Sequence, residues 1–184
     1  MKLFSVLAVG LILAGPVLAQ DWNKGLAAYN AGDYATALQE FRPFAEQGYA
    51  NAQTMLGIMY DNGNGVLQDS AEAAKWYRLA AEQGDAGAQA MLGVMYDNGN
   101  GVLQDSAEAV KWYRLAAEQG NINAQYNLGL MYVYGNGALQ DNVLAHMWWN
   151  IAGANGDALG SENRGKVEKR MTREQIAEAQ ALAR

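Results

Sequence analysis

The sequence predicts an all-α fold, a solenoid of antiparallel helical hairpins, and two observations support this. First, segment 48–83 returns as 84–119 with five differences, so 31 of 36 positions are identical, and a looser third copy follows at 120–155. Self-similarity at such a period is typical of repeat architectures, whose units bury their apolar faces against their neighbours. Second, each copy contains two apolar stripes of helical period separated by a glycine-rich turn. Each copy is therefore expected to fold as one hairpin.

Residues 1–19 have the pattern of a secretory signal peptide. A positive charge precedes an apolar run over 3–13, and small residues at Val17 and Ala19 precede the expected cleavage site. The run is shorter than the roughly 20 apolar residues that span a membrane, which disfavours an uncleaved anchor. The mature chain is expected to be soluble and exported, without a stable membrane anchor. We expect a periplasmic location, with secretion as the alternative.

Residues 20–47 are expected to form the first hairpin, with the shorter connection between its helices. Segment 33–47 aligns without a gap to the second helix of the repeat, one period of 36 residues later, and places Phe41 beside the tryptophan position. The preceding helix is expected around 21–31. Its connecting turn is four residues shorter than in the later copies, because Gly25 and Ala37 are 12 positions apart and their counterparts are 16 apart.

Two helices are expected in each full copy, 48–83, 84–119 and 120–155. We call the first helix of each copy helix A and the second helix B. In the first copy, helix A carries an apolar stripe at i, i+3, i+4, i+7 and i+8, namely Ala52, Met55, Leu56, Met59 and Tyr60. The turn 61–65 ends this helix, because its glycines adopt positive φ without steric cost. Helix B begins after an N-cap at Asp69 or Ser70. Its stripe consists of Ala73, Trp76, Tyr77 and Ala80.

Glycines lie in the middle of each helix A, at Gly57, Gly93 and Gly129. Glycine costs about 1 kcal/mol relative to alanine at such a position. We expect the compensation to be close approach of helix B with its bulky Trp76 or Trp112. The tryptophans are accordingly predicted to pack between hairpins, rather than to form a stacking surface for carbohydrate or bases.

Residues 156–184 are expected to form capping helices. Gly165 continues the mid-helix glycine register 36 residues after Gly129, within a segment that has become polar. Thr172 and Gln175 have the spacing of a capping box that opens a final helix. A solenoid requires a polar end unit for its solubility. The basic residues of this segment are interpreted as a solvated helical face rather than an anion site.

Three signature strings recur in register: Ala-Gln-x2-Leu-Gly-x2-Tyr, Gly-x-Gly-Val/Ala-x-Gln-Asp and Ala-x2-Trp-Tyr/Trp-x2-Ala-Ala. They resemble the Sel1-like repeat, a relative of the tetratricopeptide repeat, and the unit at 20–47 looks closer to the tetratricopeptide form. The resemblance implies a right-handed α-superhelix that acts as an adaptor or scaffold. It would bind a protein or peptide on the concave face of the A helices, without catalytic residues or cofactors.

Two alternatives remain open. Some secreted, cysteine-rich relatives have been described as β-lactamase-like or penicillin-binding, so a β-lactamase-like or peptidoglycan-related enzyme is the first alternative. This chain departs from those relatives because it has no cysteine. The second alternative is a secreted factor that engages a host surface. The oligomeric state is also open.

In the related repeat, groove residues flank the Leu-Gly pair of helix A. In this register they are Asn51, Thr54, Ile58, Asp61 and Asn62 in the first copy, Gly87, Ala90, Val94, Asp97 and Asn98 in the second, and Asn123, Tyr126, Leu130, Val133 and Tyr134 in the third. Our hypothesis is that Tyr126 and Tyr134 form an aromatic anchor, while Asp61, Asp97 and the amides make polar contacts. Alternatively, the tyrosines seal the last repeat against the cap.

Other chemistries find little support in the sequence. Residues 20–156 contain six Lys and Arg against fourteen Asp and Glu, so this region lacks the excess of basic residues that is typical of nucleic-acid binding. Turn 61–72 has glycine at positions 3 and 5 of an EF-hand count, so no metal site is expected. His146, the only histidine, occupies the position of Ala74 and Val110 and is expected to pack rather than transfer protons. No serine begins a Ser-x-x-Lys motif.

Overall fold

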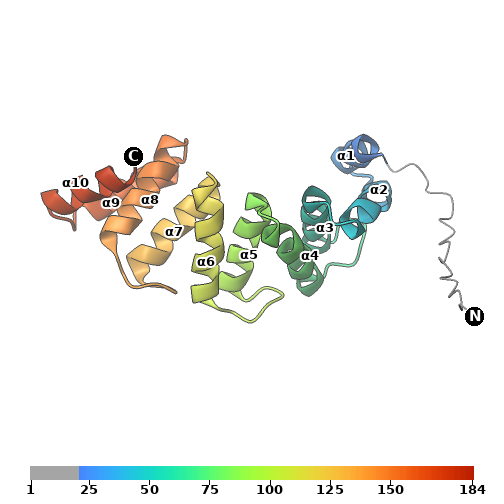
Figure 1. The fold of residues 1–184 in the computed structure, drawn as a ribbon, viewed down its shortest axis with the longest axis horizontal. Helices are drawn as coiled ribbons and strands as arrows, with labels where there is room; N and C mark the ends of the chain where they lie inside the picture. The colour runs from blue at the N-terminus through green and yellow to red at the C-terminus, as the bar shows by residue number, and fades with distance from the viewer. Residues whose placement is uncertain (1–20) are drawn as a thin grey trace, which may run out of the picture.

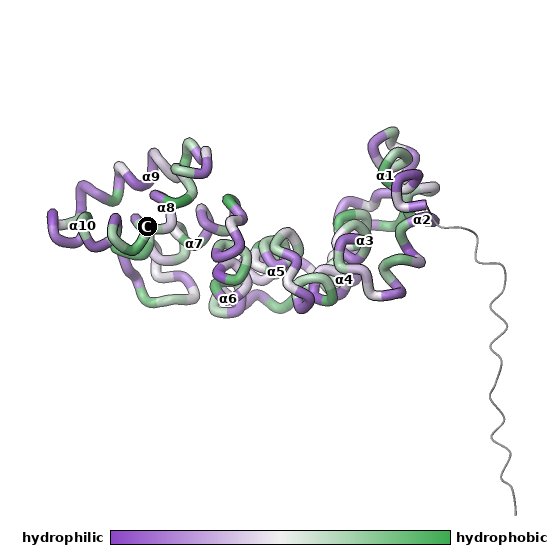
Figure 2. Tube along the Cα trace, turned by 45° about the horizontal axis from the view of Figure 1, so that its top comes forward, coloured by the Kyte–Doolittle hydropathy of each residue, from purple (hydrophilic) through white to green (hydrophobic). Residues whose placement is uncertain are grey.

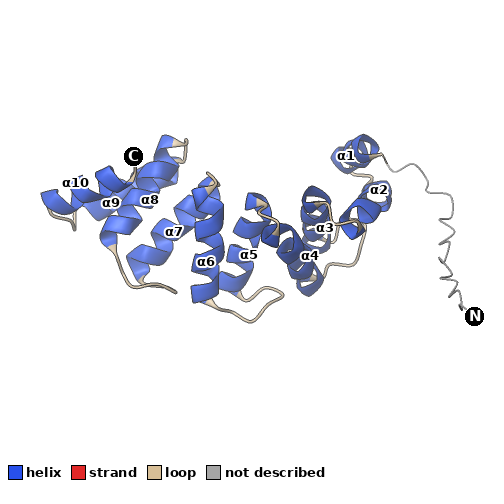
Figure 3. Ribbon diagram, in the orientation of Figure 1, coloured by secondary structure: helices blue, strands red, loops and turns tan. Residues whose placement is uncertain are grey.

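The computed structural model describes residues 21–184, which form ten α-helices joined by turns (Figures 1 and 3). The predicted signal peptide, 1–19, lies outside the described residues. Within the described part, no helix has the length and apolarity to cross a membrane. The helices are α1 (Trp22–Asn30), α2 (Tyr34–Glu46), α3 (Ala50–Asn62), α4 (Ser70–Glu82), α5 (Ala86–Asn98), α6 (Ser106–Glu118), α7 (Ile122–Tyr134), α8 (Asn142–Ala154), α9 (Ala158–Glu168) and α10 (Arg173–Leu182).

Consecutive helices pack as hairpins along an extended, curved array, so the predicted all-α solenoid is confirmed. The A helices α3, α5 and α7 each contact the next A helix, which is α5, α7 and α9 in turn. Of the described B helices, α2, α4 and α6 do not approach the next B helix as closely. In a curved array, the helices that lie closer together are on the concave side. The A helices therefore form the inner side of the curve. Figure 2 shows this curvature, with α1 and α9 rising on the same side of α5.

The glycine-rich turns join each repeat to the one before it. The first glycine of each turn adopts a left-handed conformation that ends helix A, at Gly63, Gly99 and Gly135. The second glycine docks on the preceding B helix: a Cβ at Gly101, whose φ is +69°, would overlap the carbonyl of Ser70 and lie 2.7 Å from the amide nitrogen of Ala71. Both glycines are therefore required by geometry, the first by its φ and the second also by contact between repeats.

Aspartate side chains start the B helices of the three full repeats. Asp69, Asp105 and Asp141 are the N-caps, and each side chain accepts two backbone N–H bonds from the first turn. This decides between the two predicted caps of α4 in favour of Asp69. Such a cap typically contributes about 1 kcal/mol.

The mid-helix glycines face a different aromatic side chain from the predicted one. A Cβ at Gly57 would lie 2.6 Å from the ring of Tyr77, and Gly93 and Gly129 face Tyr113 and Trp149 in the same way. The prediction of Trp76 or Trp112 at this contact was wrong. The reason is that adjacent helical positions point about 100° apart, so only the second aromatic of each pair turns into its own hairpin.

The first aromatic of each pair packs between units. Trp76 is half-buried against a cluster that joins Phe41 of the preceding unit to Leu56 of its own helix A. Trp112 packs in the same way on the cluster that joins Tyr77 to Leu92. Their indole nitrogens are buried without a hydrogen-bond partner. The expectation that tryptophans lie between hairpins therefore holds, although they are less buried than the residues that follow them.

Buried glutamines form a polar ladder through the array. Gln89 Nε2 donates to the carbonyl of Ala81 at 3.1 Å, and its Oε1 accepts from Gln119 Nε2 at 2.7 Å. Gln53 and Gln125 repeat the bond to the preceding B helix. Each glutamine thus satisfies a carbonyl near the end of the preceding B helix, which explains the glutamine of the Ala-Gln signature in physical terms.

The carboxyl-terminal helices differ from a repeat hairpin. Helix α9 contacts α7 and α8, as an A helix does, but α10 packs on α8 rather than on α9. The capping box of Thr172 and Gln175 is present at the start of α10. At Gly165 an added Cβ would meet no atom within 4 Å, in contrast to Gly129, because no aromatic side chain of a following B helix covers α9.

Candidate functional site

Two neighbouring cavities lie on the inner side of the array, and the third A helix, α7, lines both. The first, of about 230 Å³, lies between α5 and α7 and is lined by Ala90, Met91, Val94, Asn123, Tyr126 and Asn127. Four of these six residues belong to the groove predicted from the repeat register. Space opens here because α5 presents small side chains, Ala90 and Val94, opposite α7.

The second cavity, of about 120 Å³, lies between α7, α8 and the cap. It is lined by Leu130, Val133, Tyr134, Trp149, Asn163, Lys166, Val167 and Arg170. Buried apolar side chains, including Val133, Trp149 and Val167, form its floor. Tyr134 stands at the rim with 70% of its surface exposed. We call the two cavities together the inner groove.

Tyr126 joins the two cavities. Its hydroxyl accepts from Asn163 Nδ2 at 3.4 Å, and Lys166 Nζ donates to Asn163 Oδ1 at 3.3 Å. Its carbonyl accepts from the indole nitrogen of Trp149 at 3.1 Å. Tyr126 therefore contacts the cap while its ring lines the first cavity, whereas the exposed Tyr134 does not seal this end of the array. The interpretation that the tyrosines seal the last repeat against the cap therefore fits Tyr126 and not Tyr134. The aromatic anchor stays a prediction.

The first-copy residues of the predicted groove lie elsewhere. Thr54 and Ile58 are half-buried on α3. Asp61 accepts from Ser70 Oγ at 3.4 Å, and Asn62 donates to the carbonyl of Ile58 at 3.0 Å. The structure therefore does not bring the first copy into the inner groove, because these polar groups make local contacts at the end of α3. In the second copy Gly87 and Asn98 are exposed and line neither cavity.

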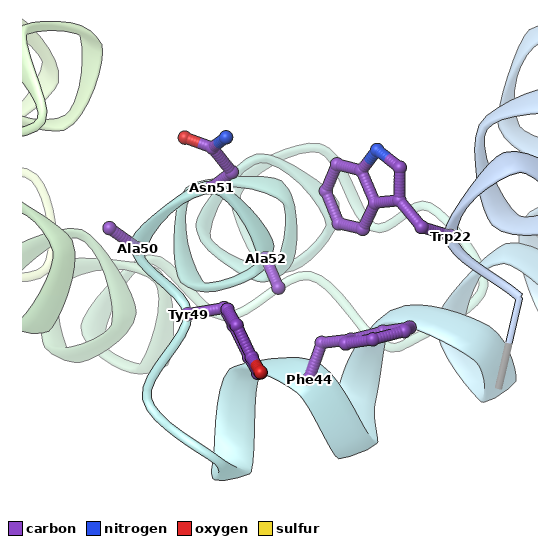
Figure 4. A pocket seen from close by; sticks show the side chains of 6 residues that line it. All are labelled: Trp22, Phe44, Tyr49, Ala50, Asn51 and Ala52. Carbon is purple, nitrogen blue, oxygen red and sulfur yellow. The ribbon is translucent and has the colours of Figure 1, made fainter.

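Asn51 lines a third cavity, of about 390 Å³, between α1, α2 and α3. Figure 4 shows its aromatic walls: Trp22 from α1 lies above Phe44, Tyr49 stands beside Phe44, and Asn51 occupies the opposite rim. The ring centroids of Phe44 and Tyr49 are 5.8 Å apart. This aromatic pocket was not predicted. It exists because α1 does not contact α3 as the later A helices contact each other.

Asp97 is the one predicted groove carboxylate with an unfavourable environment. It is half-buried, with no hydrogen bond or ion pair to its side chain among the described residues, and burial raises its pKa above the ordinary value. A raised folded-state pKa means that the ionised carboxylate destabilises the fold. This cost is present at pH 7, shrinks as the pH falls through the folded-state pKa, and is absent below the unfolded value of about 3.9.

We therefore expect Asp97→Asn to stabilise the protein at pH 7, by less than about 1 kcal/mol, since the site is partly hydrated. The gain should disappear in acid, below pH ~4. Urea unfolding of both forms across this pH range measures the effect. Asp61→Asn is the matched control and should not gain stability, because the Asp61 carboxylate accepts a bond from Ser70. Equal or lower stability of Asp97→Asn at pH 7 would contradict the assignment.

His146 is fully buried, as expected for a packing role, but it has a partner that the sequence did not indicate. Its Nε2 lies 2.8 Å from Glu168 Oε1 of α9. Glu168 also lies 3.5 Å from Arg164 Nε, and Arg164 donates to Asn150 Oδ1 at 2.9 Å. These contacts tie α9 to α8. His146 lines none of the three cavities, and the described residues contain no group of three or more acidic or histidine side chains that would hold a metal.

A family model for the Sel1 repeat matches three successive segments of the chain, 50–85, 86–121 and 122–157. Together they cover more than half of its length. The chain belongs to the Sel1 repeat family. Each matched segment begins at the first residue of an A helix, at Ala50, Ala86 and Ile122. Sel1 repeat proteins are generally protein-interaction scaffolds, and they are typically non-catalytic.

Several solved structures are similar to this Sel1 repeat protein, and two of them follow. A protective antigen present in uropathogenic Escherichia coli strains, which displays an SLR fold, is 43% identical with a TM-score of 0.77, over 81% of this chain and 33% of that chain. A Sel1 repeat protein from Oxalobacter formigenes is 36% identical with a TM-score of 0.75, over 79% of this chain and 60% of that one. The chain thus spans a third and three fifths of these relatives. No curated protein matches it.

Proposed function

We propose that this Sel1 repeat protein is an exported, non-enzymatic adaptor that binds a peptide or an extended protein segment along the inner groove. The observation that carries the proposal is the coincidence of two independent findings. The repeat register of the sequence selects Ala90, Val94, Asn123 and Tyr126, and the same four side chains line a cavity between α5 and α7. The pattern of a signal peptide at 1–19 supports export.

The chemistry of the inner groove suits a peptide. Its floor is apolar, and the amides of Asn123 and Asn127 at one cavity offer hydrogen bonds to a peptide backbone. Tyr134 is a large aromatic side chain left 70% exposed on the concave side. Partners commonly gain most of their binding energy on such aromatic residues at the centre of an interface. Tyr134 is therefore the side chain whose removal should weaken binding most without disturbing the fold.

Partner capture with Tyr134→Ala tests the proposal. The exported form of the chain would be immobilised, partners captured from an envelope extract, and their affinity measured by calorimetry. We expect at least tenfold weaker binding to Tyr134→Ala, because a hot-spot aromatic contributes about 2 kcal/mol or more. Leu115→Ala is the matched control, an exposed apolar side chain on the B helix α6. Tyr126 is left unchanged because it also holds the cap.

Three results would each contradict a part of this proposal. Equal loss of binding in Leu115→Ala would place the interface on the outer side. A partner retained fully by Tyr134→Ala would remove the aromatic anchor. Hydrolysis of nitrocefin by the purified chain would favour the β-lactamase-like alternative over a non-enzymatic role.

A secreted factor that acts at a host surface is a second candidate. The observation in its favour is the 43% identity to a protein described as a protective antigen of uropathogenic Escherichia coli. It differs from a periplasmic adaptor in where the protein goes after export. Fractionation of a culture into medium, periplasm and membrane would distinguish the two candidates.

A further inference from the structure

The second cavity of the inner groove differs in charge from the rest of the array. Residues 20–156 carry an acidic excess, six basic against fourteen acidic side chains. At the second cavity the rim instead carries Lys166 and Arg170, four residues apart, with the buried Val167 between them in the floor. The sequence interpretation of these cations as a solvated face did not foresee that they flank an apolar cavity.

Both cations are available to a ligand. Arg170 is exposed, and its guanidinium makes no hydrogen bond or ion pair among the described residues. Lys166 is paired with Glu162 at 2.6 Å, but both side chains are about 60% exposed, at 63% and 59%. Exposed pairs of this kind contribute little to stability, so a better placed anion can replace Glu162. Asn163 adds an amide at the same rim.

The size of the cavity limits what enters it. An engineered apolar cavity of about 150 Å³ binds benzene, and the second cavity has a volume of about 120 Å³. It is smaller than the benzene site and therefore has room for one aliphatic side chain. Lys166 and Val167 belong to α9 and Arg170 follows just after its end. The charge and the apolar space therefore lie side by side, so the anion of the ligand must lie within a few bonds of its apolar group.

We propose that this cavity binds the carboxyl-terminal residue of the partner. Its apolar side chain enters the space over Val167, and its α-carboxylate pairs with Lys166 and Arg170 at the rim. An α-carboxylate meets the geometric requirement because it is bonded directly to the Cα that carries the side chain. The preceding residues of the partner then run past Tyr126 toward the cavity between α5 and α7. This inference rests on the proposed function. It adds the direction in which the partner segment runs along the inner groove and the chemical class of the group that is bound, a free carboxyl terminus.

Peptides with and without a free carboxyl terminus test the inference. The probes are random octapeptides that end in leucine, synthesised as free acids and as carboxamides, and their retention on the immobilised chain is measured. We expect amidation to lower retention at least tenfold. The double variant Lys166→Gln, Arg170→Gln should bind acids as weakly as amides. Lys169→Gln, which removes a neighbouring exposed charge that does not line the cavity, should still prefer acids.

The outcomes separate this inference from the proposed function. Equal retention of acids and amides, lost in Tyr134→Ala, would overturn recognition of the terminus and leave the groove as the binding site. A preference for free acids that survives the double variant would also overturn it, because residues other than Lys166 and Arg170 would then bind the carboxylate. If neither probe is retained while captured partners still depend on Tyr134, only the proposal that the second cavity binds a carboxyl terminus fails. If the partners are also independent of Tyr134, both proposals fail.

Discussion

Gly101→Ala is expected to destabilise the array by about 2–5 kcal/mol. Two costs add at this position. The φ of +69° is unfavourable by about 1–2 kcal/mol for a residue with a Cβ. The added Cβ would also overlap the Ser70 carbonyl, a backbone group that cannot move aside by changing a rotamer. Overpacking of this kind typically costs a further 1–3 kcal/mol.

Gly120→Ala separates the two costs. Gly120 also has a positive φ, +88°, but an added Cβ there would meet nothing within 4 Å. Only the conformational cost of about 1–2 kcal/mol should appear. Chemical unfolding followed by circular dichroism measures both variants. Equal losses in the two would show that docking of the turn on the preceding repeat contributes nothing.

Tyr113→Ala should cost about 3–5 kcal/mol, the usual range for truncating a buried aromatic side chain. Tyr113 is 2% exposed and its ring packs on Gly93 at the centre of the array. Burial raises its pKa, with the Asp97 carboxylate adding to the effect, so the phenol stays neutral at physiological pH. Its loss would leave a cavity between α5 and α6 and uncouple the first repeat from the third.

The neighbouring Trp112→Ala provides the comparison. Although tryptophan is the larger residue, Trp112 is only half-buried, so its truncation should cost less than that of Tyr113. Urea unfolding should show a lower midpoint for Tyr113→Ala and, if the two halves of the array separate, a broader transition. A greater loss in Trp112→Ala would reverse the assignment of the two positions and restore the packing first expected from the sequence.

The site could be predicted only in part. Seven residues of the inner groove, four at the first cavity and three at the second, were reached by register alone, because α5 and α7 are consecutive A helices in the same setting. The residues missed come from the ends of the array. Lys166 and Arg170 belong to the cap, and Trp22 and Phe44 belong to a first hairpin whose α1 does not contact α3. A 36-residue period carries no information about units that depart from it.

The sequence by itself determined the solenoid of helical hairpins, the helix caps and the glycine turns, because these depend on local spacing repeated three times. Only the tertiary structure decided which of two adjacent aromatics turns into the hairpin. It also decided that Glu168 meets the buried His146 and that two cations flank an apolar cavity. The side chains of neighbouring helical positions point about 100° apart. Contacts between units therefore depend on how far each helix is rotated about its axis and on how the array curves. Those quantities are set by packing among all the units together, and no single repeat encodes them.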